Sequence, residues 1–155
     1  MIGAIMYIRP ATIEDVHSLF EIRCSVHENH MSREQMAALN ITPDTVRNMI
    51  ASGDYIVPVA FVDSEAVGFA MAQISESYIF ALFVTPSHEG RGIGSQLLGY
   101  VEAALHRHGV REAWLCTDAD EKVRAVGFYR HFGWCETGLM EDGQLRFCKQ
   151  LFANS

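Results

Sequence analysis

The first part of the chain shows one short apolar strand followed by a helical pattern. Residues 6–9 predict the strand, and Pro10 closes it because proline has no backbone donor. Thr12, followed closely by two acids, predicts a helix start. The apolar positions behind it recur at near-helical spacing, which predicts one buried face formed by Ile13, Val16, Leu19, Phe20, Ile22 and Val26.

Two further helix starts follow before residue 54. Ser32 stands three residues before Gln35, which is the spacing of a capping box. Thr42 precedes Pro43, whose missing donor costs little at the first helical position. Gly53 fits the end of this last helix. The front of the chain therefore predicts one strand and three helices.

Three strands are predicted next. Residues 55–62 and 66–75 form an antiparallel hairpin through residues 63–65. Residues 78–84 are apolar throughout instead of alternating, which predicts a strand buried on both faces. Pro86 should end this strand near Thr85, because proline cannot sit inside a central strand.

The apolar residues after position 92 return to helical spacing. They predict a helix that ends at Gly109 and buries Ile93, Leu97, Leu98, Val101, Ala104 and Leu105 on one side. Residues 113–117 predict another buried strand. Because a helix joins it to the strand over 78–84, we expect those two strands to be parallel.

The end of the chain predicts a helix carrying Phe128 and Tyr129 and then an antiparallel hairpin over residues 135–138 and 144–151. No repeat, low-complexity tract or linker interrupts the 155 residues, so we expect one domain over residues 1–155. The element order predicts an α/β fold, with a mixed sheet and helices on both of its faces.

Composition narrows the classes of function. The chain is 49% hydrophobic and 20% charged, which is typical of a globular enzyme and not of a disordered protein. The net charge of −7 argues against a nucleic-acid partner and is compatible with a cationic amine substrate. We expect no signal peptide and no membrane span. Free cysteines favour a cytoplasmic location.

The cysteines show no metal-binding or redox motif. Cys24, Cys116, Cys135 and Cys148 lack C-x-x-C and zinc spacing. Cys116 and Cys135 lie in apolar runs and are predicted to be buried free thiols.

The candidate chemistry lies in the glycine-rich loop between strand 78–84 and the helix that follows. Gly90, Gly92 and Gly94 leave the backbone bare, and the helix directs unpaired N–H groups at the loop. Such a helix start binds phosphate or pyrophosphate. A dinucleotide-binding fingerprint would need glycine at Ser95, and a Walker loop would need Gly-Lys-Ser/Thr, so neither motif fits.

The loop resembles that of the GNAT superfamily of acyl-CoA-dependent N-acetyltransferases. That family has Gln/Arg-x-x-Gly-x-Gly/Ala after a strand ending Val-x-Pro, and this chain has the run 89–94, Glu-Gly-Arg-Gly-Ile-Gly, after Val84-Thr85-Pro86. Glu89 departs from the usual Gln or Arg.

A second segment, residues 124–134, resembles the family's Ala-x-x-Phe-Tyr-x-x-x-Gly-Phe motif, with Trp134 in place of the last Phe. Lys122 stands where the family often has Asn. The resemblance covers residue 55 to the end, and it is loose before that point.

The resemblance implies a mostly antiparallel sheet whose central parallel pair splays apart at an acetyl-CoA site. There the backbone of strand 82–84 would line the pantetheine arm, and the amides of Arg91, Gly92, Gly94 and Ser95 would hold the pyrophosphate. Arg91 either adds side-chain charge or is an ordinary surface residue. The implied cofactor-binding set is Leu82, Phe83, Val84, Glu89, Gly90, Arg91, Gly92, Ile93, Gly94, Ser95, Gln96 and Tyr129.

The implied reaction is direct attack of a primary amine on acetyl-CoA in a ternary complex, with no metal. Tyr129 is either the general acid that protonates the leaving thiolate or a core residue. Glu28 or His30 could serve as general base, although both also fit a polar helix end. His27 and His30 have metal-ligand spacing, but no third ligand is evident. Asp118, Glu76 and Asp142 lie near strand or turn ends around the expected cleft, and the sequence favours none of the three as base.

Two alternatives stay open at this point. One is a non-catalytic acyl-CoA-binding module of the same fold, and the other is a nucleotide-binding α/β domain, which fits the motifs poorly. The acceptor is either a small-molecule or a peptide amine, and the exposed sheet edges are compatible with a homodimer.

Overall fold

The computed structural model describes residues 5–27, 30–117 and 122–152. The sheet order is β1-β3-β4-β5-β6-β8-β7, with the short β2 paired to β4. The strands are β1 (Met6–Pro10), β2 (Tyr55–Ile56), β3 (Pro58–Val62), β4 (Glu65–Gln73), β5 (Tyr78–Val84), β6 (Glu112–Thr117), β7 (Cys135–Leu139) and β8 (Leu145–Gln150). The helices are η1 (Ile13–Asp15), α1 (Val16–Ser25), α2 (Arg33–Ala38), α3 (Pro43–Ser52), η2 (Pro86–His88), α4 (Ile93–Arg107) and α5 (Lys122–His131).

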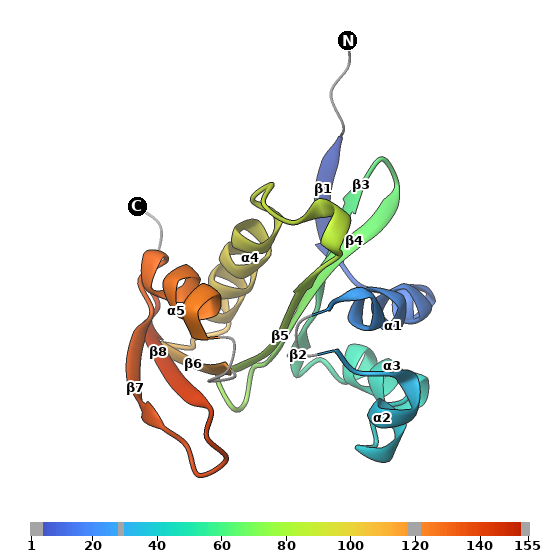
Figure 1. Cartoon of the computed structure of the whole chain (residues 1–155). Coiled ribbons are helices and arrows are strands. Elements are labelled where there is room, and N and C mark those ends of the chain that lie inside the picture. The colour runs from blue at the N-terminus through green and yellow to red at the C-terminus, as the bar shows by residue number, and fades with distance from the viewer. Residues whose placement is uncertain (1–4, 28–29, 118–121, 153–155) are drawn as a thin grey trace.

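The helices cover the two faces of this twisted sheet separately (Figure 1). α4 and α5 lie on one face, and α1, α2 and α3 lie on the other, over its N-terminal half. The apolar residues form two buried clusters accordingly, one under α4 and one under α1. All six residues predicted for the inner face of α4 are buried. The predicted layers are therefore confirmed.

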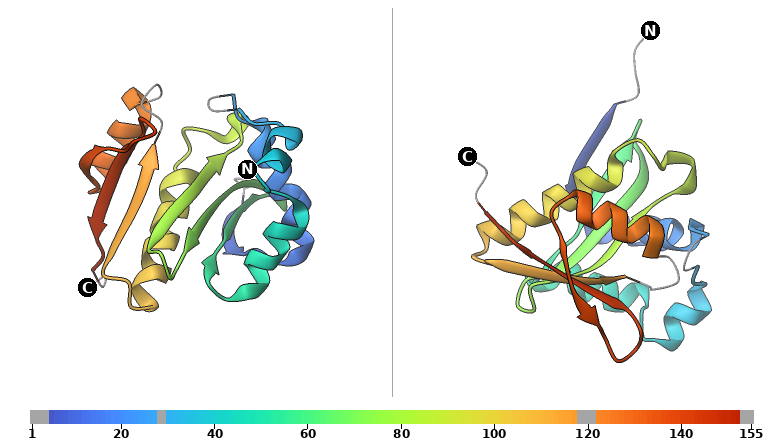
Figure 2. Two further views of the ribbon diagram at one scale, coloured as in Figure 1. Left: turned by 90° about the horizontal axis from the view of Figure 1, so that it is seen from below. Right: turned by 60° about the vertical axis from the view of Figure 1, so that its left-hand side comes forward.

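The centre of the sheet holds its one parallel pair within the described strands. β5 and β6 are joined in register only at Tyr78 and Trp114, where the Trp114 amide donates to the Ser77 carbonyl at 2.9 Å. From there the two strands diverge, as the view from below shows (Figure 2). Because β5 is fully paired with β4 and β6 with β8, the gap opens inside a sheet that is continuous on both sides.

The predicted helix starts are found where the sequence placed them. The Ser32 hydroxyl accepts from the Gln35 amide at 3.1 Å, and the Thr42 hydroxyl accepts from the Thr45 amide at 3.2 Å. Gly53 has φ of +81°, the left-handed conformation that ends α3.

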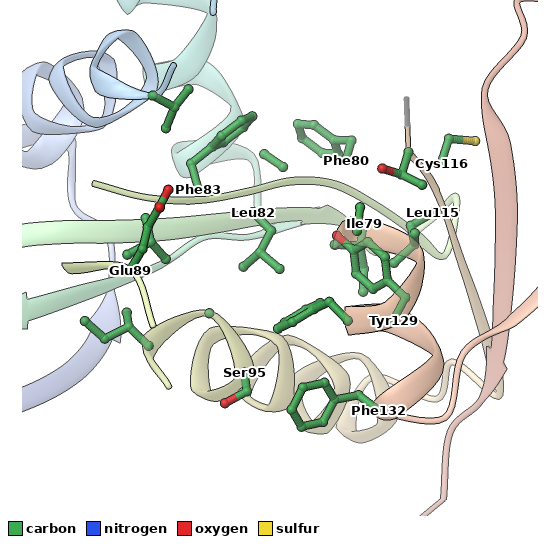
Figure 3. A pocket seen from close by; sticks show the side chains of 18 of the residues that line it. Ile79, Phe80, Leu82, Phe83, Glu89, Ser95, Leu115, Cys116, Tyr129 and Phe132 are labelled. Carbon is green, nitrogen blue, oxygen red and sulfur yellow. The ribbon is translucent and has the colours of Figure 1, made fainter. Parts of the chain in front are cut away.

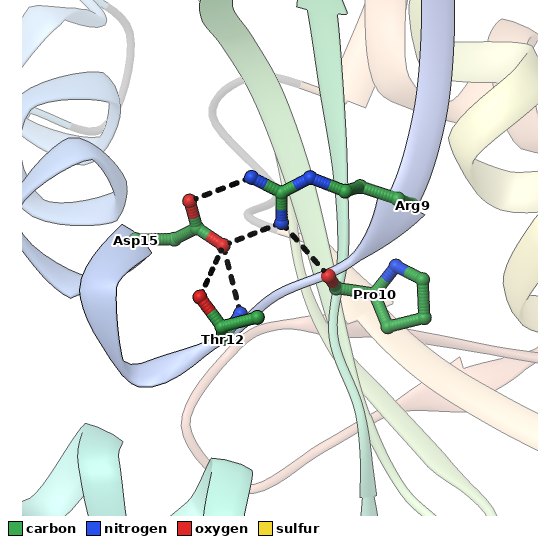
Figure 4. Close-up of polar contacts among 4 residues, drawn as sticks. All are labelled: Arg9, Pro10, Thr12 and Asp15. Atoms are coloured by element: carbon green, nitrogen blue, oxygen red, sulfur yellow. Dashed lines mark hydrogen bonds and ion pairs between the residues drawn. The ribbon is translucent and has the colours of Figure 1, made fainter.

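An ion pair fastens the first helix to the sheet (Figure 4). Both terminal nitrogens of Arg9 on β1 donate to the Asp15 carboxylate, at 2.7 and 3.0 Å. Asp15 also accepts from the Thr12 amide at 2.7 Å. The Arg9 side chain lowers the pKa of Asp15 below its usual value. This contact fixes the start of α1, whose other end reaches the cavity described below.

Four expectations from the sequence are wrong. The strand over 78–84 is not buried on both faces, because only Ile79 is buried and the rest of β5 borders an open cavity. Ile13 is 52% exposed because it lies in the 3₁₀ turn η1, where the α-helical phase of α1 does not yet hold. Residues 55–62 form two strands, broken at Val57. Neither Cys116 nor Cys135 is buried as predicted: Cys135 is exposed because β7 is an edge strand, and Cys116 is only partly buried because it borders the cavity.

Candidate active site

A cavity of about 630 Å³ lies where β5 and β6 separate (Figure 3). Its walls come from β5, the loop after it, the first turn of α4, the end of β6 and the inner side of α5. The cavity is bordered on both faces of the sheet. Leu82 and Tyr129 lie on the side of α4 and α5, whereas Phe80 and Phe83 lie on the side of α1.

One end of the cavity is the helix start predicted from the glycine-rich loop. Gly92 caps α4 with φ of +81°, a conformation that side chains other than glycine adopt with strain. The Ser95 hydroxyl donates to the Gly92 carbonyl at 2.9 Å, and the Gln96 amide donates to the same oxygen at 3.1 Å. Within the described part of the chain, the amides of residues 91–95 donate to no protein group, and these include the four predicted from the sequence, those of Arg91, Gly92, Gly94 and Ser95. The donors at this helix start are thus available to a ligand.

The side of the cavity is the separated edge of β5. Beyond Tyr78 this edge has no strand partner, so its backbone groups face the gap. Leu82 points toward α4, and Phe83 points toward α1. The guanidinium carbon of Arg23 on α1 lies 4.4 Å from the centre of the Phe83 ring. An extended backbone edge between apolar side chains can bind an amide-containing chain by strand-like hydrogen bonds.

Tyr129 lines the cavity from the side of α5. Its ring packs against Phe128, Trp134 and Phe147, with centroids 5.3, 6.3 and 5.7 Å away. Its hydroxyl is directed toward the gap beside β5 and β6 and makes no hydrogen bond to a described residue. Burial raises the pKa of Tyr129 to about 12. The phenol therefore stays protonated at neutral pH, and it can donate a proton but not accept one.

A lysine holds the end of α5 that follows Tyr129. The Lys149 ammonium donates to the Phe132 carbonyl at 2.6 Å and pairs with Glu102 on α4, also at 2.6 Å. Glu102 in turn accepts from the Trp134 indole at 3.3 Å. This partly buried network joins α4, α5 and β8 behind the cavity.

Most of the residues proposed from the sequence come together around this cavity. Its wall includes Leu82, Phe83, Val84, Glu89, Gly90, Gly92, Ile93, Gly94, Ser95 and Tyr129. Arg91 and Gln96 are exposed and lie outside the wall. Glu28 and Asp118 lie outside the described residues. His30 is placed by a 3.0 Å contact between its Nδ1 and the Val26 carbonyl, and it does not line the cavity.

The sequence did not predict several residues of the wall: Val26, Tyr78, Phe80, His88, Cys116, Thr117, Phe132 and Gln144. Cys116 and Thr117 lie at the end of β6. Gln144 lies in the β7–β8 turn, directly before Leu145, which is paired with Thr117. Burial raises the pKa of the Cys116 thiol. Register across the sheet brings these residues to the cavity, and no local pattern of residues carries that information.

The model of the acetyltransferase (GNAT) family matches residues 16–134, which is most of the chain. The chain belongs to this family. The match includes both motifs through Trp134 and also the first three helices, where the resemblance had been loose.

A curated relative is the [ribosomal protein bS18]-alanine N-acetyltransferase of Haemophilus influenzae, 28% identical over 82 residues. The match spans about half of each protein, 52% of this chain and 55% of the relative.

Within the described residues, no helix is both long enough and apolar enough to cross a membrane.

Solved GNAT structures share the fold. The PaiA N-acetyltransferase of Thermoplasma acidophilum, in complex with coenzyme A, superposes with a TM-score of 0.82 at 21% identity and covers 94% of this chain and 99% of its own. The ribosomal-protein-S18-alanine N-acetyltransferase of Escherichia coli gives 0.74 at 17% identity, covering 97% of both chains. The yncA protein of Salmonella typhimurium, with its cofactor acetyl-CoA, gives 0.76 at 17% identity, covering 97% and 96%.

Proposed function

We propose that this protein transfers the acetyl group of acetyl-CoA to a primary amine by direct attack in a ternary complex. The observation that carries the proposal is the cavity bordered on both faces of the sheet at the β5–β6 gap. A site of this form lets a cofactor enter beside α4 and an acceptor enter beside α1, so that the two meet at the gap. Membership of the GNAT family supports the reaction class.

The residues at the cavity fit an acyl-CoA. The free amides of Gly92, Ile93 and Gly94 suit a pyrophosphate, and the positive end of the α4 dipole favours its charge. The unpaired edge of β5 suits the two amides of a pantetheine arm. Acetyl-CoA supplies an activated acetyl group when bound. Solved relatives with coenzyme A and with acetyl-CoA support this choice of cofactor.

Tyr129 is the proposed general acid. Because its pKa is raised to about 12, its hydroxyl is protonated at neutral pH and can transfer that proton to a leaving thiolate. Glu28, which lies outside the described residues, is the proposed general base on the sequence argument alone, with His30 as the alternative.

The acceptor class is a primary amine, on a small molecule or at a peptide N-terminus. The Haemophilus relative acts on the alanine of a ribosomal protein, which makes a peptide beginning with alanine a sensible member of any substrate panel. A cytoplasmic location, where acetyl-CoA and such amines occur together, follows from the proposal.

The test is thiol release from acetyl-CoA in the presence of amino acids, polyamines, aminoglycosides and alanine-terminated peptides. We expect one class to give turnover that Tyr129→Phe reduces while acetyl-CoA binding persists. Binding of acetyl-CoA with no turnover on any class would favour a non-catalytic acyl-CoA-binding module. Tight binding of NAD or ATP without acetyl-CoA would overturn the proposal.

A further inference from the structure

The sheet carries three cysteines on one face of its C-terminal half. Cys135 on β7 lies directly opposite Cys148 on β8, and Cys148 lies opposite Trp114 on β6. Cys116 is two residues after Trp114 on the same strand. Residues directly opposite in a sheet share a face, as do residues two apart along a strand. These three cysteines therefore lie side by side across β7, β8 and β6, and all of them are free thiols.

Strand geometry allows a disulfide between Cys135 and Cys148 and disfavours one between Cys116 and Cys148. Directly opposed residues in antiparallel strands have Cα atoms about 4.5 or 5.5 Å apart, depending on the hydrogen-bonding pattern. Disulfides span Cα separations of about 4.4–6.8 Å, so Cys135 and Cys148 satisfy the requirement in either pattern. Cys116 and Cys148 are diagonal neighbours, about 7–8 Å apart, which exceeds that range.

The local surroundings also favour Cys135 and Cys148 as the reacting pair. Cys135 is exposed on the edge strand β7, whose five residues are all exposed. The register is regular at this pair and at the next, Glu136 and Phe147, and it shifts only beyond Glu136. An edge strand can make the small backbone adjustment that a new bond requires, because no further strand or helix packs on its outer side in the described structure.

We propose that Cys135 and Cys148 are an oxidant-responsive thiol pair that closes an intrachain disulfide in the folded protein. A hydroperoxide oxidises the exposed Cys135 thiolate to a sulfenic acid and is itself reduced to the alcohol or to water. The Cys148 thiolate then attacks the Cys135 sulfur, the S–S bond forms, and the sulfenic oxygen leaves as water. Two thiols lose two electrons and two protons in total, and a dithiol reductant reverses the change.

The bond would close the β7–β8 hairpin, whose turn brings Gln144 to the cavity wall. Constraining that loop stabilises the fold mainly by limiting the unfolded chain. We therefore expect the oxidised protein to melt several degrees higher than the reduced protein. This inference concerns the hairpin alone and does not depend on the proposed acetyltransferase activity.

The experiment treats the full chain with a mild excess of hydrogen peroxide and measures intact mass, peptide maps and melting temperature before and after reduction. The expected result is loss of two hydrogens, a single 135–148 link and a higher melting temperature that dithiothreitol reverses. Cys135→Ser and Cys148→Ser should each abolish the link. Cys24→Ser on α1 and Cys116→Ser on β6 should each keep it.

Four unchanged thiols in the oxidised, folded wild-type protein would overturn the proposal, and so would a 116–148 link or stepwise oxygen addition to single cysteines. Mapping of the wild-type protein decides the question even if a serine variant folds poorly.

Discussion

The helix start of α4 can be tested by adding one methyl group at Gly94. A Cβ placed there would lie 3.8 Å from Phe128 Cζ and 3.9 Å from Val84 Cγ2, which are ordinary van der Waals contacts. Gly94 has helical backbone geometry, so alanine brings no strain at this position. Replacing glycine by alanine in a helix raises the free energy of unfolding by about 0.5–1 kcal/mol. For a chain of this size, each kcal/mol raises the melting temperature by about 2–4 °C.

The same methyl group occupies the cavity wall. Both neighbours of the new Cβ line the cavity, and side-chain Cβ atoms lean toward the N-terminus of their helix, here toward the free amides. Crowding a close-packed site by one methyl costs about 1–3 kcal/mol. We therefore expect the dissociation constant for acetyl-CoA to rise about 5- to 150-fold.

Gly99→Ala is the matched control. Gly99 lies in the same helix, is exposed, and has open space around its would-be Cβ. It should gain a similar amount of stability without any change in affinity. Calorimetric titration with acetyl-CoA and thermal melting of both variants give the two readouts. Wild-type affinity in a folded Gly94→Ala protein would refute the placement of the pyrophosphate at this helix start.

Three further changes probe the site and its support. Tyr129→Phe should lower kcat about 10²- to 10⁴-fold with little change in acetyl-CoA affinity, and wild-type turnover in this variant would remove Tyr129 from the chemistry. Because burial raises the folded pKa of Tyr129 to about 12, the phenol of the unfolded chain ionises first, and wild-type stability should fall above about pH 10. The stability of the Tyr129→Phe variant should fall less steeply over the same pH range. Asp15→Asn should lower the free energy of unfolding by about 1–2 kcal/mol after allowing for screening of the partly exposed Arg9, measured by urea unfolding with the exposed pair's Asp44→Asn as control. Because the pKa of Asp15 is lowered, its carboxylate stabilises the fold above about pH 3.9, and this contribution is lost as the pH falls through the folded pKa. If the Asp15→Asn protein lost stability in acid as steeply as the wild type, this reasoning would be wrong. Lys149→Met should leave the Phe132 carbonyl and Glu102 without their cation and cost about 2–3 kcal/mol in thermal or urea unfolding, whereas an unchanged midpoint would show that the network does not hold α5.

The sequence predicted the parts of this fold that depend on local patterns. The buried face of α4, the capping residues Ser32 and Thr42 and the parallel relation of β5 to β6 all follow from spacing and turn residues, and the structure contains each of them. The glycine-rich loop was found because three glycines before a helix are a local signal with a physical cause.

The errors arose where the outcome depends on what packs from elsewhere in the chain. A strand of seven apolar residues has the same sequence pattern whether helices cover both of its faces or a cavity borders one edge. For this reason β5 was predicted to be buried on both faces. Cys135 lies in an apolar run, but β7 ends the sheet and no neighbour covers it. Gln144 and Thr117 reach the cavity through strand register, which no local pattern encodes.

Binding of acetyl-CoA in the cavity can be measured by calorimetric titration of the wild-type protein, with NAD and ATP as controls. We expect saturable one-to-one binding of acetyl-CoA and no binding of the two nucleotides at the same concentrations. A folded protein that binds no acetyl-CoA would show that the cavity is not a cofactor site and leave the glycine-rich loop as a strand-to-helix turn.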